Sequence, residues 1–270
     1  MDWGQITLGV IGFGRMGAAL VHSALASGLT TGDRIVAFDT DESLLENVAI
    51  RTTGSAGAVA SLADVVIIAV KPHHVPAVLA EIRDADIQCT LVISIAAGIE
   101  LAALRGGLGE SPVQIVRAMP NLAVTVGMSI TALVAEPTTG RDRLKTAESF
   151  FESCGSVVHL AREEEMHVFT ALASSGPAFA AVFAEALADG AVSEGLSRKA
   201  ARSVTAQMLR GAAELLTLES GSPAELKDLV SSPGGTTIAG LVELEKAGFR
   251  SAAIHAIKAA TARSRQLGQR

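Results

Sequence analysis

The sequence predicts an α/β protein in which a doubly wound parallel sheet is followed by an all-α domain. Up to about residue 161, short apolar runs alternate with helix-like segments, which is typical of a parallel sheet covered by helices on both faces. Beyond Leu160 the strand pattern stops, and helical periodicity continues to the end of the chain. We therefore expect a sheet domain at residues 1–161 and a helical domain at residues 162–270.

Seven apolar runs are predicted strands, because Val, Ile and Leu fill nearly every position, as in strands buried on both faces. They are Ile6–Gly12, Arg34–Asp39, Asp64–Val70, Thr90–Ile95, Val113–Ala118, Ser129–Val134 and Val157–Leu160. Between them, helices are predicted near residues 15–28, 41–49, 74–83, 99–106 and 138–153. The second domain is predicted to hold helices at 162–192, 197–219, 223–230, 236–247 and 249–267.

Composition and charge narrow the class of protein. Hydrophobic residues make up 49% of the chain, and the formal net charge of −6 without a basic cluster argues against nucleic-acid binding. Cys89 and Cys154 are too few for a disulfide framework and lack metal-ligand spacing.

The start of the chain has no basic signal region, and the apolar stretch 168–187 contains Pro177 and several polar residues. We expect a cytoplasmic protein without a membrane span.

A glycine-rich turn follows the first predicted strand and opens the first predicted helix. It reads Gly12-Phe13-Gly14-Arg15-Met16-Gly17. This strand–turn–helix context is the one that the dinucleotide-binding motif requires. Gly12 allows the tight turn, Gly14 lets a pyrophosphate approach the backbone, and Gly17 lets helix and strand pack closely. Because a helix N-terminus also offers free N–H groups to phosphates, we predict a Rossmann-type domain that binds a dinucleotide at these residues.

The second predicted strand ends at Asp39, 22 residues after Gly17. An acid at this position usually accepts hydrogen bonds from the adenosine ribose and repels a 2′-phosphate, which favours NAD over NADP. Asp41 and Glu42 follow directly, and any of the three acids can instead charge the first turn of the next helix. Asp39 is therefore a predicted cofactor ligand with a helix-capping alternative.

Three further turns follow predicted strands, at the edge where open α/β sheets bind ligands. They are Ala69-Val70-Lys71-Pro72, Ala96-Ala97-Gly98 and the turn that contains Asn121. We predict that these residues contact the cofactor, with Lys71 either facing it or lying on a solvated loop. Asn121 either hydrogen-bonds nicotinamide or substrate, or only shapes its turn. No metal site is predicted, because the adjacent His73 and His74 point in different directions and have no evident third ligand.

A second candidate anion site opens the predicted helix 236–247. The segment reads Val230-Ser231-Ser232-Pro233-Gly234-Gly235-Thr236-Thr237-Ile238. Hydroxyl residues cap a helix, proline fixes φ, and the two glycines expose backbone N–H groups, which together make an anion-binding nest. The first glycine turn already accommodates the cofactor phosphates. This nest therefore suits a substrate carboxylate, with an elaborate helix cap as the alternative.

The chain resembles the Δ1-pyrroline-5-carboxylate reductase family over nearly its whole length. The family's C-terminal signature is similar to Ser231–Leu241, followed here by Leu244-Glu245 and Gly248-Phe249-Arg250. Further blocks follow in the family's order: Ala69–Pro72, Ser94–Gly98, Met119–Asn121 and Ser175–Ala178. A run of blocks in this order is highly specific.

The resemblance implies hydride transfer from NADPH or NADH to the C=N carbon of pyrroline-5-carboxylate, the last step of proline biosynthesis. It implies that the substrate carboxylate is held at Val230, Ser232, Gly235 and Thr236. The hydroxyl of Thr237 would lie near the ring nitrogen as the catalytic group, donating a hydrogen bond to it. Residues 1–161 would bind the dinucleotide, and residues 162–270 would serve dimerisation and substrate binding.

Three positions depart from the family's usual pattern. Arg15 stands where the family has Asn in the glycine turn, which puts the cofactor contact of that Asn in doubt. Ser174 replaces a glycine, and Phe179 replaces a tyrosine, keeping its ring without the hydroxyl.

The predicted helix at 168–191 is apolar on nearly every face. A helix without a polar face must be enclosed, and about 110 residues cannot easily surround it alone. We therefore expect a partner subunit to cover it. The resemblance implies a homodimer through the helical domain, which in the family often assembles into a ring of dimers.

Three alternative functions are weighed against this interpretation. A β-hydroxyacid dehydrogenase has a similar domain order but uses a lysine in its central helix, and residues 166–198 contain no lysine. A paralogue that reduces a six-membered cyclic imino acid stays open, because one methylene discriminates by only about 1–3 kcal/mol. A non-catalytic dinucleotide sensor would not need the second nest.

Overall fold

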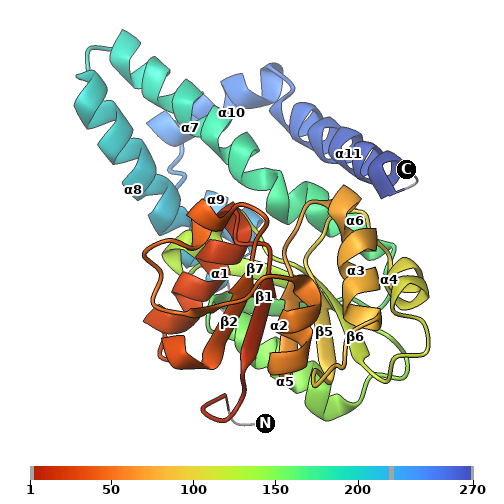
Figure 1. Cartoon of the computed structure of the whole chain (residues 1–270). Coiled ribbons are helices and arrows are strands. Elements are labelled where there is room, and N and C mark those ends of the chain that lie inside the picture. Colours follow the sequence, from red (N-terminus) through yellow and green to blue (C-terminus); the bar gives the residue numbers. More distant parts are fainter. Residues whose placement is uncertain (1–2, 219–221, 269–270) are drawn as a thin grey trace. The chain divides into compact units, whose positions relative to one another are not determined.

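The computed structural model describes residues 3–218 and 222–268, whose strands form one eight-stranded sheet in the order β3-β2-β1-β4-β5-β6-β7-β8 (Figure 1). β1 lies beside β2 on one side and β4 on the other, so the strand order reverses at β1. The strands are β1 (Leu8–Ile11), β2 (Ile35–Phe38), β3 (Arg51–Thr52), β4 (Val65–Ile68), β5 (Leu91–Ser94), β6 (Gln114–Met119), β7 (Ser129–Ala135) and β8 (Gly155–His159). This arrangement confirms the predicted Rossmann-type sheet.

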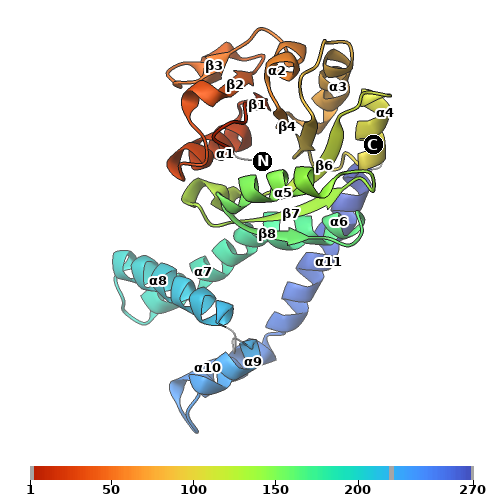
Figure 2. The same ribbon diagram turned by 90° about the horizontal axis from the view of Figure 1, so that it is seen from below.

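Both faces of the sheet are buried, because successive residues of each strand point to opposite sides. On one face, Leu8, Ile67 and Ile93 join the core beneath α1 (Arg15–Ala26) and α5 (Arg141–Glu152). The neighbouring residues of the same strands form the core of the other face beneath three helices. These are α2 (Ala56–Leu62), α3 (Val75–Arg83) and α4 (Leu101–Leu108). Figure 2 shows the two groups of helices on opposite sides of the sheet.

The last two strands, β7 and β8, contradict the prediction of a wholly parallel sheet. β7 pairs with β6 in antiparallel orientation, whereas β8 is parallel to β7. The reason is the length of the connection between Met119 and Ser129, which holds only the short 3-10 helix η4 (Leu122–Val126). A parallel crossover needs a dozen or more residues, so the chain turns back instead.

The segment after β2 also differs from the prediction, which placed a helix at residues 41–49. Only a 3-10 helix, η2 (Glu42–Leu45), forms there, because the side chain of Asp41 accepts a hydrogen bond from Ser43 N and Asn47 adopts a left-handed φ of 61°. The short strand β3 and helix α2 then follow where none was predicted. Two further 3-10 helices are η1 (Gly32–Arg34) and η3 (Pro72–His74).

Beyond β8 the described chain is helical, as predicted, but the first predicted helix is interrupted. It consists of α6 (Glu165–Phe169), the π-helical turn η5 (Thr170–Ser174) and α7 (Gly176–Ser193). The remaining helices are α8 (Arg198–Thr217), α9 (Pro223–Leu229), α10 (Thr236–Lys246) and α11 (Phe249–Gly268).

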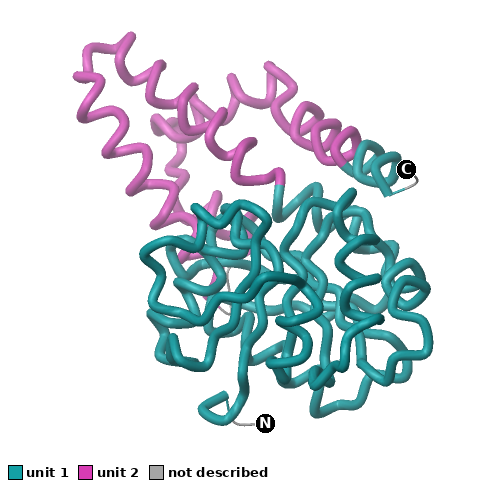
Figure 3. Tube along the Cα trace, in the orientation of Figure 1, with its two compact units in different colours: residues 1–174, 261–270 teal, residues 175–260 magenta. Residues whose placement is uncertain are grey.

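The chain forms two compact units (Figure 3). The sheet unit comprises Met1–Ser174 with Thr261–Arg270, and the helical unit comprises Ser175–Ala260. This division lies later in the chain than the expected one at residues 161 and 162. The reason is that α6 packs on the sheet, where Met166 joins a cluster with Met119 and Ala132, while His167 Nδ1 lies 3.1 Å from Ser264 Oγ in the last turns of α11.

In the helical unit, α7 and α8 form a hairpin whose short connection is anchored by an ion pair between Asp189 and Arg198. Among the residues of α7 only Ala188 is buried, and Phe179 and Val182 are exposed. The helix Glu165–Ser193 is long and apolar enough to cross a membrane, and only 17% of its most apolar window is buried in the single chain. The enclosure that the sequence predicts for this helix is therefore not supplied by the chain itself.

Candidate functional site

The glycine turn brings β1 and α1 into contact at the carboxyl edge of the sheet. Gly12 has a φ of +97°, a conformation that glycine adopts without strain. A Cβ at Gly17 would lie 2.0 Å from the carbonyl oxygen of Gly12, so any larger residue there would push α1 away from β1. A Cβ at Gly14 would meet nothing within 4 Å. The turn therefore has one glycine for each task that the sequence predicts, with open space only at Gly14.

The N-terminus of α1 suits an anion. Its N-cap residue is Gly14, no side chain caps it, and its first backbone hydrogen bond runs from Ala18 N to Gly14 O. The N–H groups of the first turn are consequently available to a ligand, and the helix dipole favours negative charge there.

Asp39 is held in a defined orientation beside this turn. Its Oδ2 accepts a hydrogen bond from Phe13 N at 2.6 Å, and its Oδ1 accepts one from Asp41 N at 2.9 Å. Asp41, and not Asp39, caps the following 3-10 helix. The carboxylate of Asp39 thus ties the end of β2 to the glycine turn, and its remaining lone pairs can still accept hydrogen bonds.

A cavity of about 350 Å³ lies between the glycine turn and the ends of β2 and β4. Six residues predicted from the sequence line it: Gly12, Gly14, Asp39, Ala69, Val70 and Lys71. The prediction missed other lining residues, namely Ile11, Phe38, Thr40, Leu44, His74, Ala77, Val78 and Glu81. Most of these come from the strand ends and from α3. The apolar face of the predicted helix at 74–83 was a sequence signal that could have indicated a wall of the cavity. The mixture of apolar walls and few polar groups is typical of a small-molecule site.

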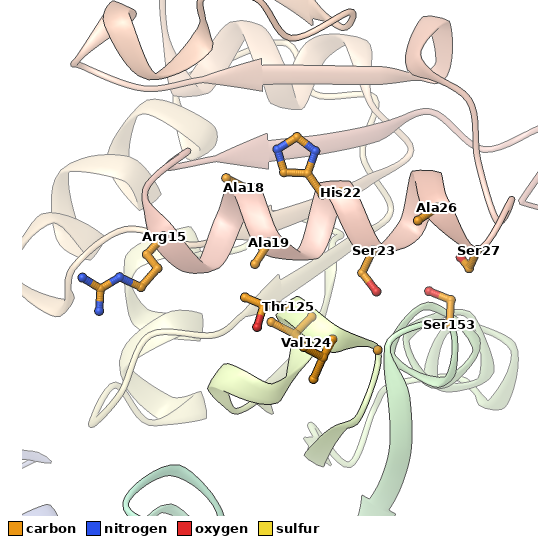
Figure 4. Close-up of a pocket in the computed structure, with 12 residues that line it drawn as sticks. Arg15, Ala18, Ala19, His22, Ser23, Ala26, Ser27, Val124, Thr125 and Ser153 are labelled. Carbon is orange, nitrogen blue, oxygen red and sulfur yellow. The ribbon is translucent and has the colours of Figure 1, made fainter. Parts of the chain in front are cut away.

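Several predicted residues do not line this cavity. Phe13 is buried in the core, Met16 packs against the core, and Gly17 contacts Gly12. Arg15 instead lines a second hollow of about 660 Å³ along α1 and η4, and Figure 4 shows it at the N-terminal end of α1. Pro72 opens the 3-10 helix η3.

Two predicted elements lie beyond the cavity, at the ends of β5 and β6. The loop Ala96-Ala97-Gly98 follows β5, with Gly98 at a φ of +78°. Asn121 is only 7% exposed, and its Nδ2 donates a hydrogen bond to the carbonyl oxygen of Ala173 in the π-helical turn at 2.9 Å. Its Oδ1 is buried and has no hydrogen-bond partner. Asn121 therefore does more than shape its own turn, because it ties β6 to the π-helical turn.

The segment predicted to form the second anion site lies in the helical unit, at the start of α10. Gly234 has a φ of +68°, Gly235 is the N-cap of α10, and no side chain caps this helix. A Cβ at Gly235 would lie 2.3 Å from Ser232 Oγ, so the hydroxyl can approach only because glycine is there. Thr237 Oγ1 donates a hydrogen bond to the carbonyl oxygen of Val230 at 2.9 Å. The first-turn N–H groups of α10 face no side-chain cap and can hold a carboxylate.

Residues 3–218 and 222–268 include no group of three or more His, Cys, Asp or Glu side chains placed to hold a metal ion. Cys89 and Cys154 are free and buried, and burial raises the pKa of the Cys89 thiol to about 11. That thiol is therefore protonated at neutral pH and is a poor nucleophile.

Comparison with known proteins identifies the family. A family described as "Pyrroline-5-carboxylate reductase dimerisation" matches residues 163–267, and one described as "NADP oxidoreductase coenzyme F420-dependent" matches residues 7–98. The pyrroline-5-carboxylate reductase of Methanosarcina acetivorans is 39% identical over 268 residues, covering 97% of this chain and 98% of the relative. That of Synechocystis is 38% identical over 270 residues, covering 98% of this chain and 100% of the relative. The chain belongs to the pyrroline-5-carboxylate reductase family.

Solved structures of pyrroline-5-carboxylate reductases share this architecture. The reductase from Coxiella burnetii matches with a TM-score of 0.89 at 33% identity, covering 98% of this chain and 99% of that chain. The reductase from Plasmodium falciparum, solved with NADP bound, matches with a TM-score of 0.87 at 29% identity and covers 99% of both chains. The family resemblance and the fold expected from the sequence are thus confirmed.

The glycine turn yields a prediction in which one substitution lowers the affinity for dinucleotide and another lowers the melting temperature. Gly14→Ala enters open space in the free protein, so we expect normal thermal stability but an affinity for dinucleotide lowered at least about tenfold, because the methyl group stands where the pyrophosphate must approach. Gly17→Ala meets the Gly12 carbonyl, so we expect a lower melting temperature. Fluorescence titration with NADH and thermal melting measure the two effects.

Gly106→Ala is the matched control, because its Cβ also meets nothing within 4 Å but lies in α4. It should bind dinucleotide normally. Equal affinities of the Gly14 and Gly106 variants would remove Gly14 from the pyrophosphate site.

Proposed function

We propose that this protein reduces 1-pyrroline-5-carboxylate to L-proline with NADPH or NADH, as the last step of proline biosynthesis. The observation that carries the proposal is that two helices of the chain, α1 and α10, each begin at a glycine and have no side-chain cap. The first suits a pyrophosphate and the second a carboxylate. Membership of the pyrroline-5-carboxylate reductase family supports the same reaction.

We assign cofactor binding to residues 1–161. The backbone of Gly12–Gly17 and the N-terminal amides of α1 hold the pyrophosphate, and Asp39 accepts hydrogen bonds from the adenosine ribose. The remaining cofactor residues follow the strand ends: Ala69, Val70, Lys71, Pro72, Ala96, Ala97, Gly98 and Asn121. When bound, the nicotinamide supplies the hydride. The buried, unpartnered Oδ1 of Asn121 is suited to accept a hydrogen bond from an amide N–H.

We assign the substrate to the helical domain, residues 162–270. Ser232, Gly235 and Thr236 present a hydroxyl and backbone N–H groups to the carboxylate. Val230 closes the segment by accepting the hydrogen bond from Thr237. Positioning is the main requirement of the reaction, because an iminium carbon accepts a hydride without a covalent nucleophile or a metal.

The orientation of Thr237 changes its expected role. A carbonyl oxygen can only accept, so the hydroxyl of Thr237 donates to Val230 and leaves its own lone pairs for the substrate. Such a hydroxyl accepts a hydrogen bond from the N–H of a protonated ring nitrogen. The nitrogen then takes its proton from water before the hydride arrives, and Thr237 orients the iminium instead of donating to it.

The function is tested by following oxidation of NADPH and NADH with pyrroline-5-carboxylate and with its six-membered homologue. Turnover of the five-membered ring supports the proposal. Preference for the six-membered ring would show a paralogue with a different substrate, and dinucleotide binding without turnover of either would show a sensor.

Substitution of Thr237 tests its role in orienting the substrate. Loss of one hydrogen bond to a charged transition state should remove about 1–3 kcal/mol of stabilisation, a tenfold to hundredfold drop in kcat for Thr237→Ala. NADPH affinity should change less than kcat. Thr237→Ser keeps the hydroxyl and should retain most of the activity, whereas a wild-type kcat in Thr237→Ala would remove Thr237 from the mechanism.

Asp39 generates a prediction about cofactor preference. Because its carboxylate is fixed beside the glycine turn and repels a 2′-phosphate, we expect NADH to be used at least as well as NADPH. Asp39→Ser should shift the ratio of kcat/KM values towards NADPH. Asp39→Asn keeps an oxygen for Phe13 N while removing the charge, and it should shift the ratio with less loss of overall affinity. A native preference of about a hundredfold for NADPH, some 3 kcal/mol, would contradict the ribose assignment.

We further propose a cytoplasmic homodimer formed through the helical domain. Sedimentation velocity, which gives the mass of the assembly, distinguishes this dimer from a ring of dimers. The exposed apolar surface of α7 supports the dimer, since isolated soluble chains rarely expose such a surface. The free, buried cysteines suit a reducing compartment.

The dimer predicts the effect of a charge on α7. Val182 is 68% exposed in the single chain, so Val182→Lys should leave the fold of the chain intact while dissociating the assembly, because an interface would have to bury the new ammonium group. Sedimentation velocity measures the mass. Leu62→Lys, at an exposed position on α2, is the control and should leave the assembly intact. A fully active 27.6 kDa wild-type monomer would refute the dimer.

A further inference from the structure

Glu163 joins two distant segments of the sheet unit through one carboxylate oxygen. Its Oε1 accepts a hydrogen bond from Leu101 N at 2.8 Å and one from Arg117 Nη1 at 2.7 Å. Leu101 is the first residue of α4, and Arg117 lies in the middle of β6. The carboxylate therefore connects the start of a helix on the sheet's surface to a strand in its interior.

Arg117 fixes the position of that carboxylate. The side chain of Arg117 is 2% exposed, and it is the only Arg or Lys among the largest fully buried side chains of the described residues. Breaking a buried ion pair leaves an uncompensated charge, which is strongly unfavourable. The position of Arg117 consequently fixes the position of the Glu163 carboxylate. Arg117 itself is fixed by the register of β6 between β5 and β7.

The N–H group that Glu163 holds belongs to Leu101, three residues after the loop Ala96–Gly98, which we assign to the cofactor. At the other end of this loop, Ile95 N bonds to the carbonyl oxygen of Ile68, and Ala96 N bonds to Ser94 Oγ. Glu100 is the N-cap residue of α4, but its side chain makes no capping hydrogen bond. Glu163 thus supplies the anchor for the far end of the loop.

The last turn of α11 lies against the same loop. A Cβ at Gly98 would be 3.3 Å from Gly268 Cα, and the hydrogen bond between His167 and Ser264 ties α11 to α6, the helix that follows Glu163. The loop is therefore enclosed between a strand end, a carboxylate anchor and a helix end, all within the sheet unit.

We propose that Glu163 is a positioning residue for hydride transfer, which holds the loop Ala96–Gly98 in the conformation that receives the nicotinamide half of the cofactor. The proposal rests on the proposed function of this loop. Without the carboxylate, the N-terminus of α4 loses its cap and the loop moves between conformations. The hydride-transfer step then slows, because the cofactor spends less time in the reactive position.

Hydrogen exchange of the free protein tests the structural half of the proposal without any ligand. In Glu163→Ala we expect the amides of residues 96–101 to exchange at least about tenfold faster than in the wild type, by loss of local protection. Glu165→Ala is the matched control. Glu165 lies two residues further along, at the start of α6, and also accepts backbone hydrogen bonds, but from Ala161 and Arg162 and not from α4. It should leave exchange at 96–101 unchanged.

Kinetics test the functional half. For Glu163→Ala we expect kcat to fall at least about tenfold, and the primary isotope effect with 4-deuterated NADH or NADPH to rise, because hydride transfer becomes rate-limiting. Glu163→Gln keeps an oxygen acceptor for Leu101 N and should recover kcat to within a few fold. A residue that only stabilises the fold would lower the melting temperature without changing the isotope effect.

Two further results separate the possible failures. If Glu163→Ala does not fold, Glu163→Asp replaces it. The shorter carboxylate still neutralises Arg117 but cannot reach both Arg117 and Leu101 N. Glu163→Asp should therefore show the same loss of exchange protection and the same rise in the isotope effect as expected for Glu163→Ala. Normal exchange and a normal isotope effect in a folded variant would overturn the proposal. A wild-type protein that does not reduce pyrroline-5-carboxylate would instead overturn the proposed function, while the exchange of residues 96–101 would still report on Glu163.

Discussion

The close approach of Gly17 to the carbonyl oxygen of Gly12 is the constraint on which the sheet unit depends. A Cβ at Gly17 would lie 2.0 Å from that oxygen, so α1 can begin directly at the end of β1 only because both positions are glycine. This contact aims the free N–H groups of α1 at the carboxyl edge of the sheet, where the order of strands reverses at β1. It also places Leu20 and Val21 in the core, so one contact serves the packing of α1 and the position of the N–H groups that we propose bind the cofactor phosphates.

Around this edge, carboxylates hold backbone N–H groups. Asp39 binds Phe13 N and Glu163 binds Leu101 N, and each bond joins segments far apart in the sequence. Hydrogen bonds to an ionised acceptor are roughly twice as strong as neutral ones, which suits them to loops that have no regular partner. An acid near a ligand site can therefore have a supporting role, and Asp39 can serve both the turn and the ribose.

The helical unit shows the limit of what a single chain can bury. α7 is apolar on nearly every face, yet among its residues only Ala188 is buried within the chain. At about 25 cal/mol per Å² of apolar surface removed from water, covering such a helix favours association strongly. Membership of a family with a dimerisation domain agrees with this physical requirement. The nest at α10, which we propose holds the substrate, belongs to the same unit, and this links assembly to the proposed chemistry.

The local pattern of the sequence determined the alternation of strands and helices, the glycine turn and the nest at Gly234 and Gly235, because periodicity and glycine chemistry act over a few residues. The direction of β7 follows from the short connection before it, whereas the partners of Asp39 and Asn121 and the anchor at Glu163 were decided by the tertiary structure alone. Each depends on contacts between residues far apart in the chain. Apart from the connection before β7, whose shortness was a missed signal, no local pattern specifies such contacts, since many distant pairings are compatible with the same apolar runs.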